Sequence, residues 1–259
     1  MRKIICTILF LAAVMSGAAG AEKQIKVALV CSSACQGYGS KDHKLIYGWG
    51  EMLPQFLDGK VKVLNLAISG ASTKSFREKG YWNKVVASKA DYVLLALGAN
   101  DTPKTKKYST TVPEFKENQR RFVKEIQAWG GKPVFVTLNQ SLGYDKTKTK
   151  AAFIKGKPLR RDRIEHSQAI RDVAKELDLP CLELFDNQYK YMVAMGEEAC
   201  SKLYRFDPRK GKIDPSHTNY DGAEFVAMII AEELAKADTP LAKYVKRNEV
   251  EKVKKRFVK

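Results

Sequence analysis

Short apolar runs alternate with longer amphipathic stretches along this chain, and this alternation constrains its fold more than any other feature. Four apolar, β-branched runs and a weaker fifth one occupy residues 25–30, 61–66, 92–97, 133–138 and 179–184. Such runs are typical of strands buried on both faces. Apolar residues recur at helical spacing in residues 113–129, 162–177 and 220–237. The alternation predicts an α/β fold in which helices cover both faces of a parallel sheet.

The two ends of the chain differ from the part between them. Residues 1–21 place two basic residues before an apolar run and end in small residues, which is the order of a secretory signal peptide. We therefore expect a secreted or periplasmic protein without stable membrane insertion. Residues 22–238 are predicted to form one domain. Residues 239–259 are predicted to be a basic, helical C-terminal extension.

Charge and cysteine content narrow the partners. Lys and Arg outnumber Asp and Glu by 46 to 29, a net charge of +17, and such a balance attracts polyanions. Export argues against nucleic acid as the partner, so we expect an acidic polysaccharide instead. We also expect the protein to be a monomer.

The four cysteines after residue 21 can pair in three ways, and we favour Cys181 with Cys200. No CxxC or HExxH spacing occurs, so no metal site is predicted.

Polar residues follow the predicted strands at the edge where ligands bind in parallel α/β sheets. These segments are Cys31-Ser32-Ser33, Ser69-Gly70 and Asn100-Asp101, with Asp214-Pro215-Ser216-His217 before the last helix. Taken singly, such a serine usually caps a helix and such a glycine usually makes a turn. Their joint occurrence at one edge favours a catalytic site.

The residue types fit nucleophilic catalysis. A serine hydroxyl must pass its proton to a base, and histidine suits that role near neutral pH. Of the three histidines, His43 lies in a charged run and His166 is expected on the solvated face of a helix. His217 alone follows a carboxylate, Asp214, by three residues, as a triad requires. The sequence therefore predicts His217 as the base and Asp214 as the group that orients it.

An oxyanion hole can be assembled from the same segments. The backbone N–H groups of Ser33 and Gly70 and the side-chain amide of Asn100 are three donors that could stabilise a tetrahedral intermediate.

The four segments resemble the sequence blocks of the SGNH (GDSL) hydrolases, and most closely those of the rhamnogalacturonan acetylesterases. The similar stretches are GWG from Gly48, NLAISGASTKSF from Asn65, GAND from Gly98 and DPSHTNYDGA from Asp214. The resemblance extends to about Lys236. It implies a flavodoxin-like, three-layer α/β/α fold with about five parallel strands and no metal or organic cofactor. It also implies the nucleophile Ser33, the oxyanion donors Gly70 and Asn100, and the pair Asp214 and His217.

One block departs from the family pattern. The family reads Gly-Asp-Ser where this chain reads Cys31-Ser32-Ser33. The register of the preceding strand places Ser33 at the nucleophile position, so Ser32 replaces the aspartate. The loss of that aspartate could loosen the turn that presents Ser33.

The predicted function is a secreted serine esterase that removes O-acetyl groups from a carbohydrate such as rhamnogalacturonan. Two alternatives stay open: an SGNH esterase or lipase for another acyl ester, and a catalytically weakened glycan-binding homologue. Basic residues after the third and fourth strands favour an anionic substrate. The proposed contacts are Lys148, Lys150, Arg160 and Arg161.

Overall fold

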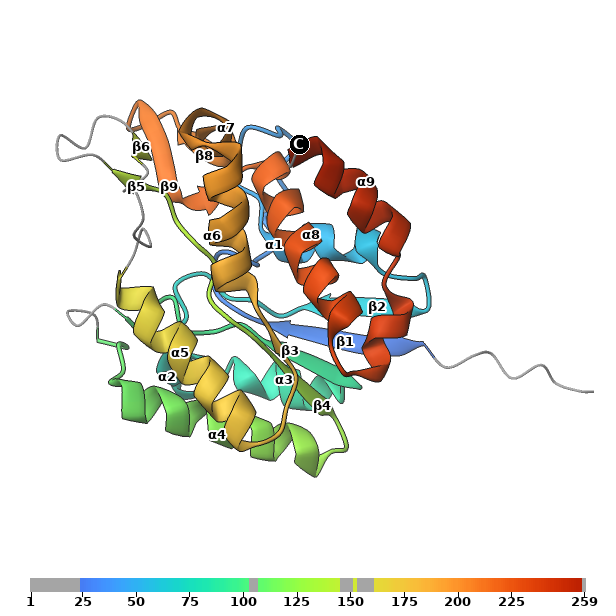
Figure 1. Ribbon diagram of the computed structural model, residues 1–259. Coiled ribbons are helices and arrows are strands. Elements are labelled where there is room, and N and C mark those ends of the chain that lie inside the picture. The colour runs from blue at the N-terminus through green and yellow to red at the C-terminus, as the bar shows by residue number, and fades with distance from the viewer. Residues whose placement is uncertain (1–23, 103–106, 145–150, 153–160, 258–259) are drawn as a thin grey trace, which may run out of the picture.

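The centre of the molecule is a parallel sheet of five strands in the order β2-β1-β3-β4-β7 (Figure 1). This computed structural model describes residues 24–102, 107–144, 151–152 and 161–257. The strands are β1 (Ile25–Val30), β2 (Val61–Asn65), β3 (Tyr92–Leu95), β4 (Lys132–Val136) and β7 (Cys181–Leu182). All five lie within or next to the predicted runs, and the predicted parallel sheet is confirmed.

Strand β1 shows why the runs are continuously apolar. Val27 and Leu29 point into one core cluster, whereas Ala28 and Val30 point into the other, and all four are fully buried. A strand covered on both faces has no side chain left for solvent, so it lacks the polar alternation of a half-exposed strand.

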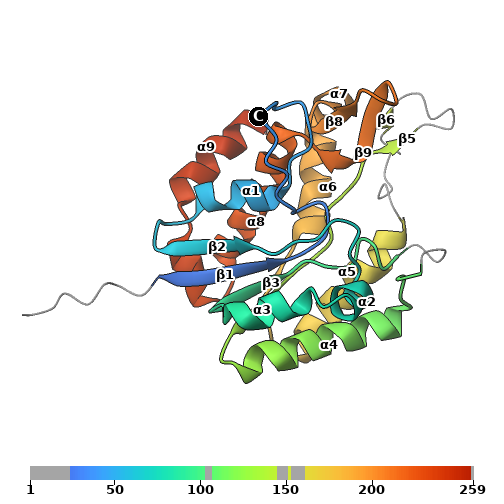
Figure 2. The same ribbon diagram turned by 180° about the vertical axis from the view of Figure 1, so that it is seen from behind.

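Helices cover both faces of the sheet and complete the predicted three layers (Figures 1 and 2). One face carries α2 (Thr73–Glu78), α3 (Trp82–Ser88), α4 (Val112–Ala128) and α5 (Arg161–Glu176). The other carries α1 (Trp49–Met52), α6 (Leu184–Met195), α8 (Tyr220–Lys236) and α9 (Arg247–Phe257). Shorter elements are η1 (Leu53–Phe56), α7 (Glu197–Ser201), η2 (Pro240–Tyr244), and the pairs β5 (Gly143–Tyr144) with β6 (Ala151–Ala152) and β8 (Tyr204–Asp207) with β9 (Lys212–Thr218).

The strand order places a switch point at the carboxyl end of β1. Strand β1 pairs with β2 on one side and with β3 on the other. The chain therefore leaves β1 and β3 in different directions, which opens a crevice at their carboxyl ends. The segments that follow β1, β2 and β3 all border this crevice.

The C-terminal residues form a helix, as predicted, and they pack on the domain rather than extending away from it. Val250 and Val253 of α9 are buried in the same core as α8. Lys246 N donates to Phe56 O at 2.8 Å, and Val245 forms a bridge with Leu57. The basic composition hid a short apolar stripe at helical spacing, and this stripe packs on the domain.

The favoured disulfide is also wrong. Cys181 and Cys200 are both free thiols, as are Cys31 and Cys35. Cys200 lies in the core cluster shared with α8, whereas Cys181 packs against the cluster on the opposite face of the sheet. The sheet separates the two thiols, which sequence spacing alone cannot reveal.

The predicted signal peptide, residues 1–21, lies outside the described residues. Among the residues that the structure describes, no helix is long and apolar enough to cross a membrane.

The packing of α9 generates a stability prediction. Val253→Ala should lower the free energy of unfolding by about 1 to 2 kcal/mol, because each buried methylene contributes about 0.8 kcal/mol. Lys255→Ala, at an exposed position of the same helix, is the control and should change it by less than about 0.5 kcal/mol. Urea unfolding measures both. Equal stability of the two variants would show that α9 does not contribute to the folded core.

Candidate active site

The loop after β1 is a tight turn that presents two serines. Ser32 O accepts hydrogen bonds from Cys35 N at 3.1 Å and Gln36 N at 3.3 Å. Trp49 N, at the start of α1, donates to Ala34 O at 2.9 Å. Asn65 Nδ2, at the end of β2, donates to Cys35 O at 2.7 Å. Three segments of the chain therefore fix the backbone of this turn.

The two glycines around Trp49 let α1 approach the turn closely. A Cβ atom on Gly48 would lie 2.2 Å from Gln36 O, and one on Gly50 would lie 2.5 Å from Cys35 O. Both distances are far shorter than any van der Waals contact. The GWG motif is thus required for the fit between α1 and the serine-bearing turn.

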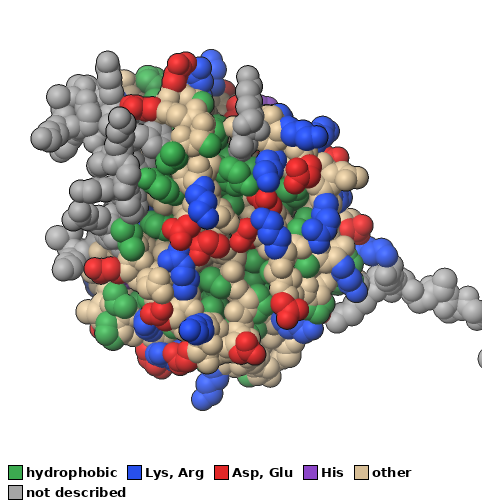
Figure 3. Space-filling view, viewed as in Figure 1, with side chains coloured by type: hydrophobic (Ala, Val, Ile, Leu, Met, Phe, Trp, Pro, Cys, Tyr) green, Lys and Arg blue, Asp and Glu red, His purple; other side chains and the backbone are tan. Residues whose placement is uncertain are grey.

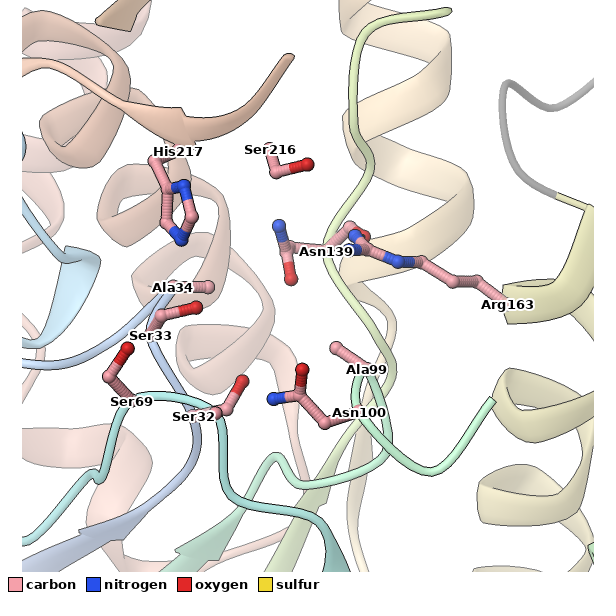
Figure 4. Close-up of a pocket in the computed structure, with 11 residues that line it drawn as sticks. Ser32, Ser33, Ala34, Ser69, Ala99, Asn100, Asn139, Arg163, Ser216 and His217 are labelled. Atoms are coloured by element: carbon pink, nitrogen blue, oxygen red, sulfur yellow. The ribbon is translucent and has the colours of Figure 1, made fainter. Parts of the chain in front are cut away.

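The two serines differ in exposure. Ser32 is only 1% exposed, whereas Ser33 is partly exposed. Figure 4 shows the Ser33 hydroxyl directed into the pocket, below the ring of His217. Cys31, which stands where the family has glycine, is buried and its thiol donates to Ala96 O at 3.3 Å. The departure from the family pattern therefore leaves Ser33 facing the pocket.

Strand β9 carries the predicted base and its partner carboxylate. His217 Nδ1 lies 2.8 Å from Asp214 Oδ2. Ser216 N donates to Asp214 Oδ1 at 2.9 Å, and Arg205 Nε donates to Asp214 Oδ2 at 2.9 Å. Burial raises the pKa of Asp214, but the bonds from His217, Ser216 and Arg205 outweigh it and hold the pKa well below its ordinary value. Asp214 is therefore ionised near neutral pH, and Nε2 of His217 is left for the pocket.

The segments after β2 and β3 border the opposite side of the pocket. Gly70 has a φ of +74°, in the left-handed region that favours glycine. Asn100 Nδ2 donates to Ala71 O at 3.0 Å, which fixes its amide, and the amide nitrogen points toward the serine turn (Figure 4).

Asp101 anchors the turn that carries Asn100. Its side chain is fully buried and accepts hydrogen bonds from Thr73 N at 3.0 Å and Thr110 Oγ1 at 3.0 Å. Burial raises the pKa of Asp101, although these bonds oppose the shift. The Asn-Asp pair thus combines one pocket residue with one structural residue.

These residues enclose a pocket of about 290 Å³. Its lining is Ser32, Ser33, Ala34, Ser69, Gly70, Ala99, Asn100, Asn139, Arg163, Ser216 and His217. Every predicted catalytic or oxyanion residue except Asp214 lines it, and Asp214 contacts it through His217.

Sequence reasoning missed the wall formed by Asn139 and Arg163. Asn139 follows β4, so its place after a strand could have revealed it. Arg163 lies in the first turn of α5, is only 5% exposed, and donates from Nη1 to Asn139 O. Among many basic residues, no sequence signal marked Arg163 as the one that lines the pocket.

The predicted substrate contacts lie largely beyond the structure. Lys148, Lys150 and Arg160 are outside the described residues, and Arg161 begins α5 with its side chain not described.

The prediction that His166 lies on the solvated face of its helix is wrong. His166 is buried, with its ring edge-on to Phe115. The apolar face of α5 is wider than its charged sequence suggested.

The fold and the pocket define a three-layer α/β hydrolase. The GDSL-like lipase/acylhydrolase family matches residues 32–224, and this chain belongs to that family of carboxylic ester hydrolases.

Individual relatives agree with this assignment. The chain is 32% identical over 210 residues to rhamnogalacturonan acetylesterase RhgT of Bacillus subtilis (strain 168), covering 75% of this chain and 83% of that protein. It is 24% identical over 222 residues to the probable rhamnogalacturonan acetylesterase YesY of the same organism, covering 84% and 95%.

Solved structures share the fold. The YxiM protein of Bacillus subtilis superposes with a TM-score of 0.65 at 24% identity, over 82% of this chain and 56% of that one. The acetylxylan esterase Axe2 of Geobacillus stearothermophilus has a TM-score of 0.60 at 16% identity, over 82% and 95%.

The contact between α1 and the serine turn generates a prediction. Gly50→Ala should destabilise the protein by about 1 to 3 kcal/mol, as overpacking does, and should lower the kcat of ester hydrolysis because the turn must shift. Gly59→Ala is the matched control, since its Cβ would meet no atom within 4 Å. Thermal unfolding and hydrolysis of a chromogenic acetyl ester measure the two effects. Unchanged activity in Gly50→Ala would show that the turn tolerates displacement.

Proposed function

We propose that this protein is an exported serine esterase that removes O-acetyl groups from an acidic carbohydrate, with acetylated rhamnogalacturonan as the favoured substrate. One observation carries the proposal: a single pocket brings together the Ser33 hydroxyl, the Asp214-bound ring of His217 and the amide of Asn100. The named acetylesterases among the relatives support the same reaction class.

The reaction follows from this geometry. Ser33 Oγ attacks the acetyl carbonyl carbon while His217 Nε2 takes its proton, and Asp214 stabilises the imidazolium. The oxyanion is held by the N–H groups of Ser33 and Gly70 and by the Asn100 amide. His217 returns the proton to the departing sugar oxygen, which leaves an acetyl-serine. A water molecule, deprotonated by His217, then releases acetate and restores Ser33.

The pocket lining favours a short acyl group. Serine, asparagine, arginine and histidine side chains alternate with glycine and alanine, and no large apolar side chain lines the pocket among the described residues. A long acyl chain needs an extended apolar surface to leave water. The lining therefore supports acetyl over fatty acyl substrates and disfavours the lipase alternative.

Arg163 supports an acidic sugar. Its guanidinium is buried in the pocket wall beside Asn139 (Figure 4). A guanidinium carries a permanent positive charge that attracts a carboxylate. A galacturonate unit next to the acetylated sugar would bring such a carboxylate to the pocket. The high net positive charge of the chain would add a longer-range attraction.

The assignment of the nucleophile is tested by a matched pair of variants. Ser33→Ala should reduce kcat by about 10⁴-fold or more, because loss of a triad member leaves only the oxyanion hole and binding. Ser32→Ala is the neighbouring control and should retain most of the activity. Hydrolysis of a chromogenic acetyl ester and thermal unfolding are measured for both. If Ser32→Ala is the inactive variant, the register of the turn assigned here is wrong.

The acidic substrate is tested with Arg163. Arg163→Gln should raise KM for acetylated rhamnogalacturonan fragments by about 10-fold or more, since hydrogen bonds to a charged group contribute about 1.5 to 3 kcal/mol. Its KM for a small neutral acetyl ester should change little, and Arg163→Lys should lie between. Released acetate gives the rates for both substrates and for neutral acetylxylan. Equal effects on all substrates, or a preference of the native protein for acetylxylan, would contradict an acidic substrate.

A further inference from the structure

One oxygen of the Asp214 carboxylate contacts nitrogen atoms of two side chains, His217 and Arg205. His217 Nδ1 lies 2.8 Å from Asp214 Oδ2, and Arg205 Nε donates to the same oxygen at 2.9 Å. A triad requires only the first of these contacts. Arg205 is therefore an additional group in direct contact with the residue that orients the base.

The hairpin is built so that Arg205 reaches this position. Arg205 lies between Tyr204 and Phe206, where the register of β8 against β9 is interrupted by a bulge or irregularity. Bulges commonly redirect a side chain next to an active site. The other end of the guanidinium, Nη2, lies 3.7 Å from Asp207 Oδ2, and Asp207 is buried. Two carboxylates and a break in the strand register therefore fix Arg205.

Other charged or titratable groups line the pocket or contact the serine turn and α1, and they act differently. Arg163 of α5 lines the same pocket, and Tyr38 of the loop after β1 donates to Ser33 O at 2.9 Å. Glu51 of α1 accepts from the backbone of Gly48 at 3.1 Å. Among the described side chains, Arg205 is the permanently charged cation that pairs with Asp214.

We infer that Arg205 is a positioning residue that, through the oxygen of Asp214 that it shares with His217, disfavours the protonated form of His217 relative to a site without this charge. When His217 is protonated, two cations contact the same oxygen, at 2.8 and 2.9 Å, and like charges so close together oppose ionisation. Arg205 also withdraws part of the carboxylate charge that would stabilise the imidazolium. This inference rests on the proposed role of His217 as the base.

Removing the charge of Arg205 should shift the pH dependence of activity in one direction. Removing the charge of Arg205 makes the imidazolium more stable, so His217 gains its proton at a higher pH. The acid limb of kcat/KM against pH should therefore move to higher pH by about one unit, within the range for charges 4 to 6 Å apart. Activity at pH values well below the limb should fall about 10-fold relative to the native protein, whereas activity above the limb should change little.

Arg205→Gln tests this inference, and Arg209→Gln is the matched control. Arg209 lies on the same hairpin and loses the same charge, but it is 88% exposed and its recorded ion pair is to Asp207 at 4.0 Å. Arg205→Lys keeps the charge and should keep the acid limb near its native place. Arg205→Met is a second neutral variant if Arg205→Gln does not fold.

Two measurements separate this inference from the proposed function. The chain has three histidines, so NMR can follow the titration of His217, identified by the signal lost in His217→Asn. This titration midpoint should rise by about one pH unit in Arg205→Gln and stay near its native value in Arg209→Gln. The pH dependence of kcat/KM for a small neutral acetyl ester should follow the same order.

Failure of the inference about Arg205 can be told apart from failure of the proposed esterase function. If a folded Arg205→Gln or Arg205→Met protein moves the midpoint no more than Arg209→Gln does, the inference is overturned while the esterase proposal stands. If the native protein hydrolyses no ester, the proposed function fails, and the NMR titration still decides whether Arg205 acts on His217.

Discussion

The pairing of β1 with two parallel neighbours is the constraint on which the rest of the structure depends. Beyond the strand itself, Leu66 N and Ile68 N donate to Leu29 O and Cys31 O at 3.1 and 3.0 Å, and Ala96 N donates to Val30 O at 2.9 Å. These bonds continue the pairing of neighbouring strands beyond the ends of the strands. The loops that bear the serine, the glycine and the asparagine therefore start from one rigid edge, and their mutual placement costs little further ordering.

His217, the proposed base, comes from a distant part of the chain, yet it is bonded to the same framework. Tyr47 N donates to Thr218 O at 3.0 Å, and Thr218 Oγ1 donates to Tyr47 O at 2.9 Å. Two residues further on, Trp49 N bonds the serine turn. Residues 47–50 are thus a common support for both the nucleophile loop and the end of β9. This support relates Ser33 to His217 although 184 positions of the numbering separate them.

The sheet, its main helices and the pocket residues Ser33, Gly70, Asn100 and His217 could be predicted because burial on two faces and short strand-end motifs leave clear local signals. What could not be predicted depends on contacts distant in sequence. The pairing of Arg205 with Asp214 needs the register of β8 against β9, and the selection of Arg163 from many basic residues needs the start of α5 beside β4. The packing of α9 and the separation of Cys181 from Cys200 likewise follow from tertiary arrangement.

The pocket has two walls with separate supports. Ser33 and His217 are fixed through residues 47–50, whereas Asn139 and Arg163 come from the end of β4 and the start of α5 and are bonded to each other. Basic and acidic side chains are interspersed on the face of the molecule that Figure 3 shows. Substitutions on the second wall can therefore alter which sugar is accepted while the reacting groups keep their places. Such an arrangement makes the protein evolvable: new specificities can arise by changing few residues, without rebuilding the chemistry.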